Sequence, residues 1–217
     1  MNRTFLIASI SNTWHNSIHL AEQLMTQAKY CGASAIHIDL SNLQKPHFMF
    51  LKSYADKFNL PMIATVDTKD QFEWLKEADV KLHIMTVDHL NDSTKCASFV
   101  QTGLPTFVSL QGWQKDRLPL GNEFKNVKYL VDDESLDYVN FEGFNSNVNG
   151  VIINSTEKSE FAYNSVRKGA KVVLCEFGLG KSESHLNDDE LKLLRCRLNE
   201  AESNLIDVSF EDNSSNI

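Results

Sequence analysis

The chain has 217 residues, 42% of them hydrophobic and 10% aromatic, so a single packed domain is expected and general disorder is excluded. Its formal net charge of -8, with Lys and Arg scattered along the chain, argues against nucleic acid or an anionic membrane as the main partner, because both attract a basic face. The four cysteines lie far apart and form no CxxC pair, which predicts reduced thiols and neither a disulfide framework nor a zinc site.

Short apolar runs rich in Ile and Val recur along the chain, and each is bounded by turn formers or charged residues. This pattern is typical of strands that are buried on both faces. The predicted strands cover residues 4–11, 35–40, 62–67, 81–86, 106–111, 127–132, 151–155 and 171–177.

Segments with the i, i+3, i+4 spacing of an amphipathic helix lie between most of these runs. A further helix is expected from Asp188 to Ser203, whereas residues 112–126 and 133–150 are rich in Asn and predict weak or truncated helices. Eight strands that alternate with helices are typical of a (β/α)8 TIM-type barrel. We therefore expect one compact α/β barrel over residues 1–204, loosened after strands 5 and 6, and an acidic, disordered tail over residues 205–217.

Five short motifs follow one another in the first half of the chain: IASIS at 7–11, GASAIHID at 32–39, IATVD at 63–67, IMTVDHLN at 84–91 and GLPTFVS at 103–109. In this order they resemble the I-A-E-I-G, G-A-D-A-V-K-F-Q, S-T-P-F-D, K-I-x-S-x-D-x-x-N and G-K-P-V-I-L-S-T-G motifs of the N-acylneuraminate (sialic acid) synthases. The resemblance implies a (β/α)8 barrel that condenses phosphoenolpyruvate with an N-acyl hexosamine with the help of a divalent metal.

The departures from the family pattern fall on the residues to which the resemblance would assign catalysis or ligand and metal binding. Ser9 stands in place of the family's Glu, and His37 and His83 stand in place of two lysines. The family's two metal-binding histidines have no counterpart in the stretches 153–156 and 174–177. The resemblance therefore predicts that the original reaction is lost, and Mn²⁺ or Mg²⁺ is expected only if the chain is catalytic.

Polar residues at the carboxyl ends of the strands of such a barrel are expected to form its site. The candidate catalytic groups are His37, Asp39, Asp88 and Glu176. The candidate ligand-binding residues are Ser9, Ser11, His15, Thr65, Asp67, His83, Thr86, Asn91, Ser109, Gln111 and Asn154.

Several of these residues have a structural alternative. Asp67 and Asp88 directly precede helical segments, where N-cap or turn residues belong. His37 and His83, if they point into the barrel, act either as a general base with a raised pKa or as hydrogen-bonded residues of the interior.

Two functions follow as expectations. The first is an accessory or non-catalytic paralogue that binds a sugar, or a protein partner, in nonulosonate or surface-glycan biosynthesis. The alternative is an active aldol-type synthase acting on phosphoenolpyruvate and an N-acyl hexosamine. The expected ligand is a small sugar or sugar phosphate, with a homodimer or a pathway protein as the macromolecular partner. Because no signal peptide or long apolar run is recognisable, the cytoplasm is the expected location.

Overall fold

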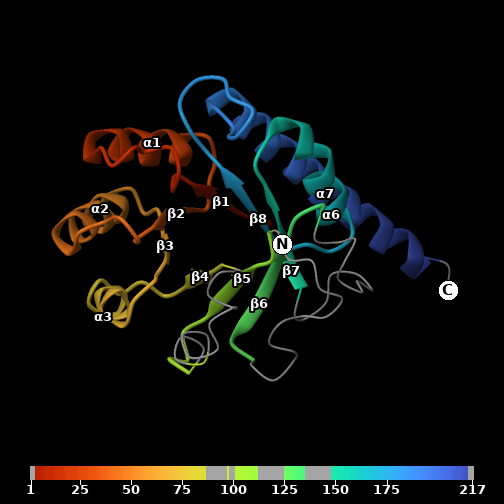
Figure 1. The fold of residues 1–217 in the computed structure, drawn as a ribbon. Coiled ribbons are helices and arrows are strands. Elements are labelled where there is room, and N and C mark those ends of the chain that lie inside the picture. The colour runs from red at the N-terminus through yellow and green to blue at the C-terminus, as the bar shows by residue number, and fades with distance from the viewer. Residues whose placement is uncertain (1–2, 87–96, 98–100, 112–124, 135–147, 215–217) are drawn as a thin grey trace.

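The computed structural model describes residues 3–86, 97, 101–111, 125–134 and 148–214. Eight parallel strands close into a barrel in chain order, because β1 pairs with both β2 and β8 (Figure 1). The strands are Phe5–Ser9 (β1), Ala35–Asp39 (β2), Met62–Thr65 (β3), His83–Met85 (β4), Thr106–Ser109 (β5), Val127–Val131 (β6), Val148–Ile153 (β7) and Val172–Glu176 (β8). The predicted TIM-type barrel is confirmed.

Helices surround this barrel, with α1, α2 and α3 on one side and α6 packed against α7 on the other (Figure 1). Their bounds are Ile18–Tyr30 (α1), Lys45–Lys57 (α2), Lys69–Glu77 (α3), Ser159–Arg167 (α6) and Asp188–Ser214 (α7), with a 3-10 turn at Thr156–Lys158 (η2).

Two boundaries differ from the sequence-based expectation. Helix α7 continues to Ser214 instead of ending at Ser203, and β7 begins at Val148, within the range predicted to hold a weak helix. Most of the residues 112–126 and 133–150 lie outside the described residues, so their predicted helices stay predictions. Residues 205–214 continue α7 in the structure, and the disorder expected of residues 205–217 stays a prediction.

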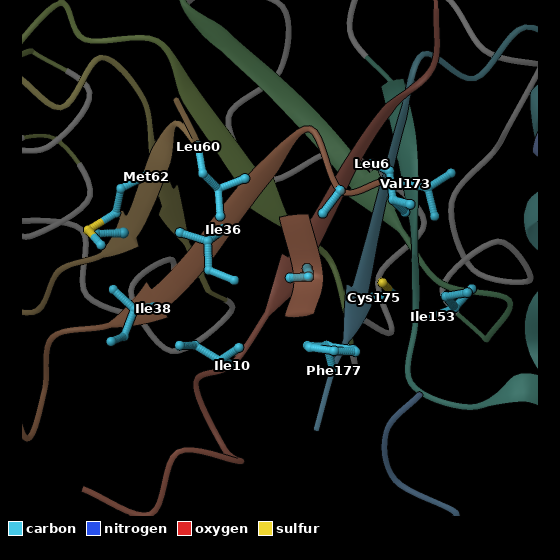
Figure 2. Close-up of a cluster of buried hydrophobic side chains, with 14 of the residues drawn as sticks. Leu6, Ile10, Ile36, Ile38, Leu60, Met62, Ile153, Val173, Cys175 and Phe177 are labelled. Atoms are coloured by element: carbon cyan, nitrogen blue, oxygen red, sulfur yellow. The ribbon is translucent and has the colours of Figure 1, made fainter. Parts of the chain in front are cut away.

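Alternate residues of each strand enter two separate apolar layers, as the period of a strand requires. The inner layer fills the barrel and includes Ile7, Ile63 and Leu174. The outer layer lies beneath the helices, and Figure 2 shows members of it such as Leu6 and Val173. Because Ile7 and Leu174 point inward, the residues two positions further along β1 and β8 also point inward, at the carboxyl end of the barrel.

Local sequence sets the ends of the helices. Thr68 is the N-cap of α3, since its hydroxyl accepts from the Gln71 backbone N–H and the Gln71 side chain accepts in return from the Thr68 N–H. Gly32, at a φ of 92°, follows α1 in the left-handed region that glycine adopts readily.

Helix α7 is fastened to the start of β1 through one residue. The Thr4 N–H donates to Glu202 Oε1 at 2.6 Å, and Arg195 Nη1 donates to the Thr4 carbonyl at 2.9 Å. Arg195 is only 4% exposed, so its aliphatic part also belongs to the packing between α7 and the barrel. We call these two contacts the Thr4 clamp.

Candidate functional site

Five polar side chains form one hydrogen-bond network at the carboxyl end of β8, β1, β2 and β3, which we call the barrel mouth. Ser9 Oγ donates to Glu176 Oε1 at 3.0 Å and also lies 3.0 Å from His37 Nδ1. His37 Nε2 lies 2.9 Å from Thr65 Oγ1. Ser11 Oγ completes the network, 3.3 Å from Ser9 Oγ and 3.2 Å from His37 Nδ1.

The register of the strands explains why these residues meet. Ser9 is the direct partner of His37 on β2 and of Glu176 on β8. All three occupy inward positions, two residues beyond members of the inner apolar layer. The network therefore lies just beyond the inner apolar layer, at the carboxyl ends of the strands, where site residues of such barrels are found.

Burial sets the charge of the network. It raises the pKa of Glu176 to about 7, against a smaller lowering by the Ser9 hydrogen bond. Burial also lowers the pKa of His37, which is 7% exposed, to about 4. At neutral pH the imidazole is therefore uncharged, and the carboxyl group is divided between its protonated and ionised forms.

These pKa shifts decide between the two interpretations of His37. A general base with a raised pKa is wrong for this residue, because its pKa is lowered and both ring nitrogens contact hydroxyl groups. His37 is a neutral, hydrogen-bonded part of the interior. Glu176, by contrast, exchanges a proton near neutral pH and is the group of this network suited to acid–base chemistry.

Asp39 is the last residue of β2, and Asp67 lies two residues after β3. Asp39 Oδ1 accepts from the Ser41 N–H at 2.8 Å, which is the hydrogen bond of an Asx turn. Asp67 precedes the cap of α3, because Thr68 supplies the capping hydroxyl. The interpretation of Asp67 as the N-cap is therefore wrong by one residue.

His83 does not point into the barrel, and that prediction is wrong. Its ring meets the edge of Phe72 on α3, with the ring centroids 4.8 Å apart, and its Nε2 lies 2.8 Å from Thr106 Oγ1. The next residue, Ile84, occupies the inner layer instead. Since neighbouring residues of a strand face opposite sides, His83 packs beneath the helices and not at the barrel mouth.

The other candidate residues are spread around the rim. Ser109 is buried at the end of β5, and Thr86 and Asn154 are partly buried just after β4 and β7. His15 and Gln111 are exposed. Asp88 and Asn91 lie outside the described residues, so their predicted roles stay predictions.

A cavity that the sequence did not predict lies between the loops after β7 and β8. It has a volume of about 500 Å³ and is lined by Ser155, Thr156, Glu157, Ser182 and Glu183. The position of these residues directly after two late strands is the signal that could have found them. Their side chains add hydroxyl and carboxylate groups to the rim.

The residues described here do not fit the divalent metal that the resemblance implies. Asn154 and Glu176 are the oxygen ligands available at the ends of β7 and β8, but the pKa of Glu176 is raised to about 7 and its Oε1 accepts from Ser9. Within the described ranges, no three His, Cys, Asp or Glu side chains come together as a metal site would need.

No protein-family model matches the chain, and no curated protein matches it. Solved structures do. The barrel is similar to an N-acetylneuraminic acid (sialic acid) synthetase from Leptospira borgpetersenii, solved with citrate, with a TM-score of 0.73 and 15% identity over 94% of this chain and 85% of that one.

A spore coat polysaccharide biosynthesis protein from Bacillus subtilis gives a TM-score of 0.74 and 16% identity over 94% of this chain and 70% of that chain. A truncated 3-deoxy-D-arabino-heptulosonate 7-phosphate synthase from Thermotoga maritima gives a TM-score of 0.72 and 10% identity over 94% of this chain and 88% of that chain. At these identities the likeness establishes a shared fold, that of a closed barrel of eight parallel strands. Among the helices that the structure describes, none has the length and apolar character needed to cross a membrane.

Proposed function

We propose that the barrel mouth binds a hydroxyl-rich, sugar-like ligand and that the protein is an accessory, non-catalytic paralogue of the sugar-acid synthases, acting in nonulosonate or surface-glycan biosynthesis. The observation that carries this proposal is the network of Ser9, Ser11, His37, Thr65 and Glu176, which replaces a charged site with hydroxyl groups, a neutral imidazole and a carboxyl group. Such groups both donate and accept hydrogen bonds, as the hydroxyl groups of a sugar require. Fold neighbours named for sialic acid and spore coat polysaccharide synthesis support the same context.

The network also supports the loss of the condensation reaction. Phosphoenolpyruvate carries a phosphate and a carboxylate, which proteins hold with Arg and Lys. The resemblance places a lysine where His37 stands, and His37 is uncharged at neutral pH. Lys158, which follows β7, donates to Asp133 at 2.7 Å and is already engaged.

A turnover assay and a binding assay together test the proposal. Purified protein is mixed with phosphoenolpyruvate, Mn²⁺ and each of several N-acyl hexosamines, and released phosphate is measured. In parallel, hexoses and hexosamines are titrated into the protein and followed by calorimetry. We expect saccharide binding without phosphate release, and we expect Thr65→Val to weaken that binding while His19→Gln, on the exposed face of α1, leaves it unchanged. Phosphate release with any of these sugars would overturn the proposal.

One observation favours the second candidate, an active synthase. Glu176 has a pKa of about 7 and so both gives and takes a proton near neutral pH, which is what a catalytic acid or base needs. This function requires turnover in the assay above, and that turnover would fall by roughly 100-fold or more in Glu176→Gln. The absence of phosphate release under all conditions eliminates it.

A further inference from the structure

One oxygen of Glu176 is left without a partner. Oε1 accepts from Ser9, but Oε2 is buried and makes no hydrogen bond in the structure. A buried polar atom without a partner destabilises the folded state, and more so if it is charged. Such an atom at the mouth of a barrel marks a place where a water molecule or a ligand group supplies the missing donor.

Within the part of the chain that the structure describes, no basic side chain pairs with this carboxyl group. The pKa of Glu176 is governed by burial and by Ser9, with no contribution from a basic side chain. Of the basic residues described after β7 and β8, Lys158 is paired with Asp133 and Lys181 is exposed. Carboxylates also line the neighbouring loops, at Glu157 and Glu183. An anionic ligand is therefore disfavoured at this side of the mouth.

We infer that the ligand of the barrel mouth carries a free amino group, as an amino sugar does, and that its ammonium group pairs with Glu176. This inference rests on the proposed sugar-binding function and names its ligand class. An ammonium group supplies three donors and the positive charge that the carboxylate lacks, whereas an N-acyl amide supplies one uncharged donor. The Glu176 side chain is partly exposed at the end of β8.

Pairing with an ammonium group has a consequence that can be measured. It requires the ionised carboxylate, so a protein in which Glu176 is partly protonated must release that proton on binding. Among the described residues beside Glu176, none releases a proton near neutral pH: Ser9 is a hydroxyl, His37 is already neutral, and burial raises the pKa of the Cys175 thiol on the same strand. A released proton therefore comes from Glu176.

Calorimetry at pH 6.5 tests the inference. Glucosamine, N-acetylglucosamine and glucose are titrated into the wild-type protein in two buffers with different heats of ionisation, so that protons released are counted. A charge-assisted hydrogen bond contributes about 1.5–3 kcal/mol, so we expect glucosamine to bind roughly 10-fold to 100-fold more tightly than its N-acetyl form. We also expect more than about half a proton to be released with glucosamine and none with the other two sugars.

The variants Glu176→Gln and His19→Gln complete the design, with folding checked by circular dichroism. In Glu176→Gln the preference for the amine and the proton release disappear, whereas in His19→Gln both persist. Equal or tighter binding of N-acetylglucosamine by the wild-type protein, or amine binding without proton release, would overturn the inference and leave the proposed sugar binding standing. If no saccharide binds the folded wild-type protein, the proposed function itself fails. The wild-type proton count decides the matter even if Glu176→Gln does not fold.

Discussion

The pH dependence of stability gives the sharpest test of the network, because His37 and Glu176 act in opposite directions. Folding lowers the pKa of His37 from 6.5 to about 4. The stability that comes from the neutral ring is therefore present above pH 6.5 and is lost as the pH falls toward 4. Folding raises the pKa of Glu176 from 4.5 to about 7, so its contribution is present below pH 4.5 and is lost as the pH rises to 7.

The two contributions nearly cancel between pH 4.5 and pH 6.5. Each shift corresponds to about 3 kcal/mol in total, or about 1.4 kcal/mol for each pH unit within its window. In the wild-type protein the rise from His37 offsets the fall from Glu176. Glu176→Gln and His37→Asn each remove one titrating group and keep a hydrogen-bonding side chain. In each variant, the pH dependence of the unfolding free energy that comes from the other group is therefore no longer offset.

Urea unfolding at pH 4.5, 5.5, 6.5 and 7.5 measures these slopes. Relative to the wild-type protein, Glu176→Gln should become more stable as the pH rises through the window, and His37→Asn should become less stable. A constant loss from altered packing shifts a whole curve without changing its slope, so the slope difference isolates the titration. Parallel curves for all three proteins would refute the charge states derived for this network.

Three further predictions concern the scaffold. Gly150→Ala should destabilise the barrel by about 3 kcal/mol or more in urea unfolding, because a Cβ there would lie 2.6 Å from Val172 Cβ on the neighbouring strand, and a change below about 1 kcal/mol would contradict that close approach. Thr68→Ala should cost about 1 kcal/mol through loss of the α3 cap, while Thr68→Ser, the matched control, keeps most of the stability. Arg195→Ala should lower the free energy of unfolding by about 2–4 kcal/mol. Arg195→Met should lower it much less, because Met refills most of the volume. Equal losses in the two variants would mean that the hydrogen bond to Thr4 dominates.

Periodicity in the sequence was enough to predict the barrel, because each buried strand is a short apolar run with clear boundaries. It was not enough to orient β4. The run from residue 81 to 86 has buried side chains on both faces, so no alternation of polar and apolar residues shows which face is inside, and His83 was assigned to the wrong one. The error about Asp67 arose because Asp67 and Thr68 are both residue types that favour the N-cap position, and only Thr68 occupies it.

The members of the network were identified from sequence, but their electrostatic state was not. Ser9 and Glu176 are 167 residues apart, and their contact depends on the closure of the barrel between β1 and β8. The raised pKa of Glu176 and the lowered pKa of His37 both come from burial, which only the tertiary structure creates. A residue list alone therefore suggested a basic histidine where the fold produces a neutral one.

The Thr4 clamp has a consequence for how the chain reaches its folded state. Its two hydrogen bonds join Thr4 to Glu202, 198 positions away, and to Arg195, 191 positions away. In addition, one edge of β1 is paired only when β8 is in place. During synthesis the first strand therefore emerges long before its final neighbours, with an open edge that invites pairing with other chains. Contacts so distant along the chain slow folding, and the joining of the first strand to the last helix cannot occur until both have been synthesised.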